Sequence, residues 1–159
     1  MEFPDNPVLL RHRGHRYLTL RKLQRAESDL TRARALTLGQ PDIVEKDGAP
    51  NPAGIPTSTL QGNITYHLGL ARFLQGDFEG AEEAYRDCYS LSGWNDDMLC
   101  ATTNWLYITF RRLGRDEEAM AILDAITDDM NILENHAYHQ LLLLYKGERN
   151  IEEVLQPSA

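Results

Sequence analysis

The fold of this chain is decided by residues 62–95, which read GNITYHLGLARFLQGDFEGAEEAYRDCYSLSGWN. Apolar residues recur there at helical spacing on both sides of Gly76, so the stretch predicts two helices joined by a tight turn. The first helix contributes Gly69, and the second contributes Ala81 and, four residues later, Tyr85. Residues four apart lie on one face of a helix, and small residues let two helices approach closely. We therefore expect an antiparallel helical hairpin that closes at these three positions.

The second helix of this hairpin has two counterparts elsewhere in the chain. Each copy has a small residue, a large apolar residue four positions later, and a small or apolar residue three positions after that. The copies are Ala26, Leu30 and Ala33; Ala81, Tyr85 and Cys88; and Ala119, Leu123 and Ile126. Internal repeats of this kind predict helical hairpins that stack and share one core. Because no sustained alternation of apolar and polar residues indicates a strand, we expect an all-α fold.

These residues resemble the tetratricopeptide repeat (TPR), a helix–turn–helix unit of about 34 residues with the pattern W-x2-L-G-x2-Y, then A-x3-F, then P. The copies depart from it where Arg13 replaces the leucine and Tyr107 replaces the glycine, and we expect Tyr107 to push its hairpin apart or rotate it. The chain is also similar to bacterial TPR proteins in which a long loop follows the first hairpin. The resemblance implies a right-handed α-solenoid of about three to three and a half stacked hairpins in a single domain, 1–159. Its units would cover residues 7–40, 62–95, 100–133 and, in part, 134–155.

Helical spacing also predicts the bounds of the last helices. The second helix of the third unit is expected over Asp116–Ile126, and the partial fourth unit is expected to begin with a helix from about Ile132 to Tyr145. Gly147 breaks that helix, so a short final helix is expected from about Asn150.

Residues 41–61 form an insertion between the first two units. They contain four prolines and two glycines, which exclude a regular helix across most of the segment. Ser58 or Thr59 is expected to cap the helix that follows. Loops of this length are uncommon inside compact domains and are either functional or disordered. The insertion is therefore a feature in which to look for what is specific to this protein.

The resemblance implies that the first helix of each unit lines a concave groove that binds an extended peptide or a partner helix. Arg, Tyr and Trp, which are enriched in the predicted lining, are typical of binding surfaces. An alternative is that several of these side chains pack against the 41–61 loop folded into the groove. The predicted groove residues are Arg11, His12, His15, Asn63, Tyr66, His67, Leu70, Asn104, Trp105, Ile108 and Arg111.

The formal net charge of −8 is unevenly distributed. Residues 1–38 carry a net charge of +4, so the remainder of the chain carries −12. This asymmetry indicates one basic binding face or head-to-tail association of copies, whereas an acidic chain is a poor candidate for binding nucleic acid. No apolar run approaches the roughly 18 residues of a membrane span, so we expect no membrane insertion. The first residues lack a basic segment followed by an apolar one, so we expect a soluble, cytoplasmic protein.

Metal and cofactor chemistry has little support in the sequence. His12 and His15, and likewise His136 and His139, can share a helix face, but neither pair has an evident third ligand. The two cysteines fit no metal or redox spacing and are expected to be buried thiols. No phosphate-binding loop or nucleophile motif is present. We therefore expect neither a metal nor a cofactor.

Three functions remain open at this point. The first is a protein-interaction scaffold that binds a peptide or helix and has no catalysis of its own. The second is an accessory or catalytic domain with a site between loop 41–61 and the groove histidines. The third is a structural module that associates with itself through the ends of the array.

Overall fold

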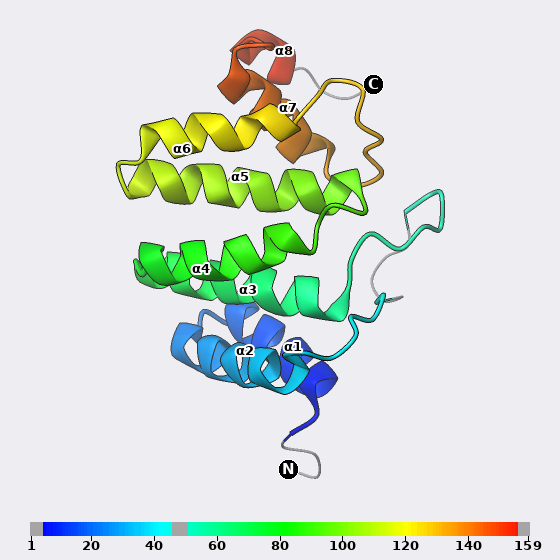
Figure 1. Cartoon of the computed structure of the whole chain (residues 1–159), viewed down its shortest axis with the longest axis vertical. Coiled ribbons are helices and arrows are strands. Elements are labelled where there is room, and N and C mark those ends of the chain that lie inside the picture. The colour runs from blue at the N-terminus through cyan, green and yellow to red at the C-terminus, as the bar shows by residue number, and fades with distance from the viewer. Residues whose placement is uncertain (1–4, 46–50, 156–159) are drawn as a thin grey trace.

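The computed structural model describes residues 5–45 and 51–155, and every regular element in them is a helix (Figure 1). Residues 46–50, which belong to the predicted loop, lie outside the described residues. So do residues 1–4, on which the expected cytoplasmic location of the protein depends. The elements are α1 (Pro7–Thr19), α2 (Leu23–Thr37), α3 (Leu60–Gln75), α4 (Phe78–Ser90), α5 (Asp96–Arg112), α6 (Asp116–Ala121), the 3₁₀ helix η1 (Ile122–Ala125), α7 (His136–Lys146) and α8 (Ile151–Val154).

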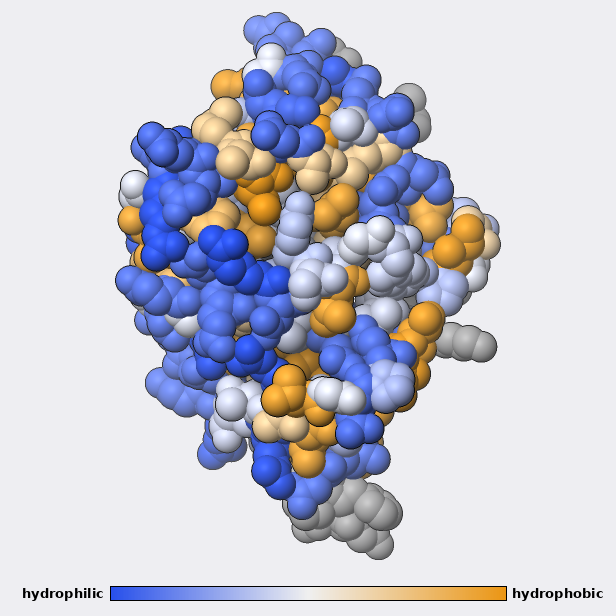
Figure 2. Space-filling model, viewed as in Figure 1, coloured by the Kyte–Doolittle hydropathy of each residue, from blue (hydrophilic) through white to orange (hydrophobic). Residues whose placement is uncertain are grey.

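The helices form layers that follow the chain from one end of the molecule to the other. In Figure 1 the α1–α2 hairpin lies at one end, α3–α4 and α5–α6 follow, and α7 and α8 complete the stack. Hydrophilic residues cover most of the face shown in Figure 2, and hydrophobic residues appear in groups between them. The predicted all-α stack of helical hairpins is confirmed. Within the described residues, no helix is long and apolar enough to cross a bilayer.

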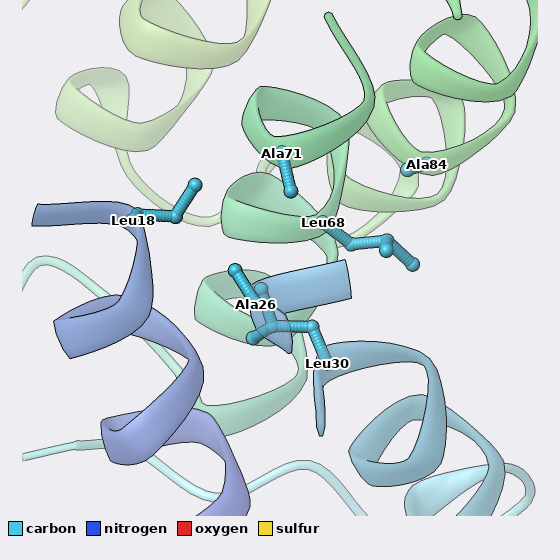
Figure 3. Close-up of a cluster of buried hydrophobic side chains, with 6 residues drawn as sticks. All are labelled: Leu18, Ala26, Leu30, Leu68, Ala71 and Ala84. Carbon is cyan, nitrogen blue, oxygen red and sulfur yellow. The ribbon is translucent and has the colours of Figure 1, made fainter. Parts of the chain in front are cut away.

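The repeated apolar positions lie where neighbouring hairpins meet. One buried cluster combines side chains from α1, α2, α3 and α4, so it joins the first hairpin to the second (Figure 3). Burying such side chains away from water is the main force that holds the layers together. The residues of this cluster are Leu18, Ala26, Leu30, Leu68, Ala71 and Ala84.

Two glycines mark the close crossing inside a hairpin, as the spacing predicts. A Cβ atom at Gly14 would lie 2.7 Å from Cγ of Leu30, and one at Gly69 would lie 2.6 Å from the ring of Tyr85. The third hairpin has Tyr107 at the equivalent position. Its ring stacks on Tyr145 of α7, with ring centroids 4.4 Å apart. The bulky side chain therefore contacts the next layer, and a displacement of its own hairpin stays a prediction.

The expected helix bounds near the C-terminus are wrong in two places. The predicted Asp116–Ile126 helix ends at Ala121 and tightens into η1, and the carbonyl of Ile126 accepts a hydrogen bond from Lys146 Nζ at 2.6 Å instead of continuing the helix. The helix α7 begins at His136, four residues later than predicted.

The late start of α7 has a clear cause in the buried carboxylate of Asp97, which is 1% exposed. It accepts hydrogen bonds of 2.8 Å from the backbone N–H groups of Leu133, Glu134 and Asn135. Buried N–H groups need a partner, and this carboxylate supplies one outside a helix. Asp97, the second residue of α5, thus fixes the backbone that leads into α7.

Candidate partner-binding groove

Side chains from three first helices meet in one chain of hydrogen bonds. Trp105 Nε1 on α5 donates to the hydroxyl of Tyr66 on α3 at 2.9 Å. That hydroxyl lies 3.4 Å from the hydroxyl of Tyr138 on α7. Burial, followed by the hydrogen bond to Tyr138, raises the pKa of Tyr66, so this phenol stays neutral. The three rings are partly buried and link three consecutive layers of the stack.

Further aromatic contacts hold these hydrogen-bonded side chains in place. The ring of Trp105 lies parallel to that of Tyr85, with centroids 6.1 Å apart, and meets the ring of Phe73 edge-on at 5.3 Å. Tyr138 was not among the predicted groove residues. It stands four residues after the expected start of the partial unit at residue 134, as Tyr66 does after residue 62. Extending the repeat register into the partial unit would have found it.

Two of the three predicted groove histidines, His15 and His67, form a pair. The rings of His15 and His67 lie 4.5 Å apart. Nδ1 of His67 bonds to the carbonyl of Asn63 at 2.6 Å, and because a carbonyl only accepts, the neutral ring carries its proton on Nδ1. Burial lowers the pKa of His67 to about 3, and burial followed by the charge of Arg11 lowers the pKa of His15. Both imidazoles are therefore neutral at pH 7. His12 lies elsewhere on α1, with its Nδ1 3.0 Å from Nη1 of Arg11.

Two predicted groove residues hold the insertion loop. Arg11 forms an ion pair of 2.7 Å with Glu45, and both side chains are at most 9% exposed. The amide Nδ2 of Asn63 donates to the same carboxylate and to Ser58 Oγ at 2.8 Å. For these two residues the alternative of packing against loop 41–61 describes the structure.

The remaining predicted groove residues differ in their surroundings. Asn104 is 2% exposed, and its Oδ1 has no hydrogen-bond partner among the described residues. Leu70 packs against the core cluster between the first two hairpins. Ile108 is half-buried, and Arg111 is exposed with an ion pair of 3.2 Å to Asp116. Their role in binding a partner stays a prediction.

A small pocket of about 220 Å³ opens where the loop, α3, α5 and the start of α7 meet. The loop is fastened beside it, because Asn51 Nδ2 donates to Glu134 Oε1 at 2.8 Å and Asn95 Nδ2 donates to the carbonyl of Thr57 at 2.7 Å. The residues that line the pocket are Thr57, Ser58, Asn63, Tyr66, His67, Met98, Ala101, Glu134 and Asn135.

Ser58 and His67, which both line this pocket, are not paired with each other as a nucleophile and its base. A serine nucleophile needs a base within hydrogen-bond reach. The hydroxyl of Ser58 instead bonds to the amide of Asn63, and the Nδ1 of His67 is occupied by a backbone carbonyl. Across residues 5–45 and 51–155, no three His, Cys, Asp or Glu side chains come close enough to hold a metal ion.

Comparison with known families matches residues 63–93 to the tetratricopeptide repeat. The matched segment contains most of α3 and all of α4, the hairpin that carries Gly69, Ala81 and Tyr85. No curated protein and no solved structure matches the chain.

Proposed function

We propose that the first helices of this chain bind an extended peptide or a partner helix and that it has no catalysis of its own. The match of residues 63–93 to the tetratricopeptide repeat supports the binding of a protein partner. The observation that supports this proposal most directly is the hydrogen-bonded series of side chains Trp105, Tyr66 and Tyr138. It offers partly buried aromatic rings from three consecutive layers to one ligand. Aromatic side chains of this kind supply most of the binding energy at protein interfaces.

Preorganisation also favours binding at this surface. The ring of Trp105 is held by a hydrogen bond to Tyr66 and by contacts with Tyr85 and Phe73. A side chain that is already fixed loses little conformational entropy when a partner binds. A ligand would therefore gain contacts with these rings without the cost of ordering them.

The insertion loop narrows the region in which the partner would lie. Arg11 and Asn63 are engaged by Glu45 and Ser58, so they contribute to holding the loop rather than to a free surface. We infer that a partner lies along α5, over Trp105 and toward Ile108 and Arg111.

Photo-crosslinking tests this location directly. Ile108 is replaced by p-benzoylphenylalanine, and the control carries the same residue at Met120, which is 47% exposed on α6. We expect a partner to be crosslinked in cells from position 108 and not from position 120. The crosslinked segment is then synthesised, and its affinity for the unmodified protein is measured by calorimetry.

Two variants make the outcome decisive. Trp105→Ala is expected to weaken binding of that segment at least about tenfold, the effect of removing an interface hot spot. Arg111→Glu alters only an exposed side chain, so it tests the same surface without disturbing the core. Unchanged affinity in both variants, with circular dichroism showing them folded, would place the binding surface elsewhere.

A further inference from the structure

We propose that the pocket beside the loop receives an arginine side chain of the bound partner. The inference rests on the proposed function and names the chemistry of one anchor within it. It is drawn from the size of the pocket, its hydrogen-bonding groups and its charge.

The pocket is smaller than most sites for free ligands. Sites for small molecules and cofactors usually measure about 300–1,000 Å³. This pocket measures about 220 Å³, which suits a single side chain of a longer ligand. It also lies beside Tyr66, so a peptide over the aromatic chain could place a side chain in it.

Several of the donors around the pocket are already used, which favours a ligand that brings donors of its own. An asparagine amide has two N–H donors. Asn63 gives both to Glu45 and Ser58, and Thr57 gives its hydroxyl hydrogen to Glu134. The unprotonated Nε2 of His67 and the carboxylate of Glu134 retain capacity to accept. A guanidinium group, with five donors and no acceptor, complements this set.

The charges near the pocket favour a cation. Within the described part of the chain, Glu134 forms hydrogen bonds with the neutral groups of Asn51 and Thr57 and has no ion pair to a basic residue. Arg11, which contacts the loop, is already paired with Glu45. His67 adds no positive charge, because burial keeps its pKa near 3. An anionic ligand would meet the charge of Glu134 without compensation.

The apolar groups of the pocket suit arginine better than a compact ammonium. The planar guanidinium group can form two parallel hydrogen bonds to a carboxylate and stacks on aromatic rings. Glu134 supplies the carboxylate, Tyr66 the ring, and Met98 and Ala101 an apolar surface for the methylene stem.

The test uses two probes that differ in one functional group. Nα-acetyl-L-arginine N-methylamide is titrated into the ¹⁵N-labelled full-length protein, and the citrulline analogue, which is neutral and nearly isosteric, is titrated in parallel. We expect the arginine probe to shift the amide signals of Tyr66, Met98 and Ala101 saturably. The citrulline probe should bind at least about tenfold more weakly, since it lacks the charge-assisted pair.

A matched pair of variants tests the role of Glu134. Glu134→Gln should weaken arginine binding at least about tenfold and keep its contacts with the loop, because the amide oxygen can still accept from Asn51 and the amide N–H can donate to the hydroxyl oxygen of Thr57. Glu117→Gln removes the same charge from an exposed residue on α6 and should change the affinity less than about twofold.

Equal binding of citrulline, or unchanged binding in Glu134→Gln, would overturn the inference. So would shifts confined to residues outside the pocket. These outcomes are independent of the proposed function, since the probe needs no natural partner. A partner crosslinked at position 108 whose binding ignores Glu134→Gln would keep the interaction function and remove the arginine anchor.

Discussion

His67 is an imidazole that the fold keeps uncharged. Its Nδ1 donates to the carbonyl of Asn63 at 2.6 Å, and the ring of His15 lies 4.5 Å away. Burial lowers its pKa to about 3, whereas an unfolded chain would hold this group near its ordinary value of 6.5. At the scale of single residues, this difference links the protonation of one groove side chain to the stability of the protein.

The free energy of unfolding should therefore fall as the pH drops below about 6.5. The unfolded chain binds a proton at His67 that the folded chain cannot bind until the pH approaches 3. One such proton changes the stability by at most about 1.4 kcal/mol for each pH unit. Urea unfolding at pH 7 and pH 5 should show that the unmodified protein loses roughly 1–2 kcal/mol more than His67→Gln does over this interval.

The matched control for this prediction is His136→Gln, because His136 is exposed. This variant should lose as much stability between pH 7 and pH 5 as the unmodified protein. If His67→Gln and the unmodified protein lost the same amount, the neutral imidazole would not be the cause of acid sensitivity.

The repeated hairpins differ in what fills the crossing between their helices. The first hairpin sets Gly14 against Leu30, and the second sets Gly69 against the ring of Tyr85. In the third, Tyr107 faces α7 and stacks on Tyr145. At the scale of elements, glycine is thus required in the two hairpins where the second helix places Leu30 or Tyr85 directly against it.

Gly69→Ala should destabilise the protein by about 1–3 kcal/mol, the usual effect of adding a methyl group to a filled core. Its Cβ would lie 2.6 Å from the ring of Tyr85, so the ring or the helix must move. The control is Gly93→Ala, because nothing lies within 4 Å of a Cβ at that position. Chemical unfolding of both variants measures the difference, and equal midpoints would show that α3 and α4 can separate without cost.

The repeat spacing predicted the packing of these elements because it is periodic along the chain. Ala26, Leu30, Ala81 and Tyr85 were expected at the crossings, and all four are fully buried. Asp97 could not be recognised in this way. Its partners stand 36 to 38 residues later and are backbone groups, which have no sequence signal. For this reason the start of α7 was predicted four residues too early.

The candidate site was predictable only as far as the repeat register extends. Register placed Tyr66 and Trp105 on the same surface, where they form a hydrogen bond. It could not show that Arg11 and Asn63 hold the loop, because Glu45 lies in an insertion that has no counterpart in the repeat. Long-range pairs between a repeat and an insertion depend on a loop path that local patterns do not encode.

The two halves of the charge distribution meet inside the molecule. Residues 1–38 carry +4 and the rest carries −12, yet Arg34 of α2 already pairs with Glu83 at 2.9 Å and with Asp87, both on α4. Arg11 of α1 likewise pairs with Glu45 at 2.7 Å. At the scale of the whole molecule, part of the basic charge of the first hairpin is used within the chain, which leaves less of it to attract a second copy.

We therefore expect the protein to be monomeric at both low and high ionic strength. Light scattering at about 50 mM and 500 mM NaCl checks this, because at the higher salt concentration charges attract each other over only a few ångströms. A dimer or larger species at the lower salt that dissociates at the higher salt would contradict the prediction. It would support self-association through the ends of the array instead.

The base of the insertion loop has a consequence for engineering. The backbone N–H of Glu45 donates to the carbonyl of Ser58 at 3.1 Å, and the N–H of Leu60 donates to the carbonyl of Ile43 at 2.8 Å. Since these bonds hold the two ends side by side, the length of chain between them is not set by the helices. Each doubling of the length of a closed loop lowers the stability of the folded protein by only about 0.6 kcal/mol. A reporter domain spliced between Glu45 and Asn51 would thus leave the helical register intact.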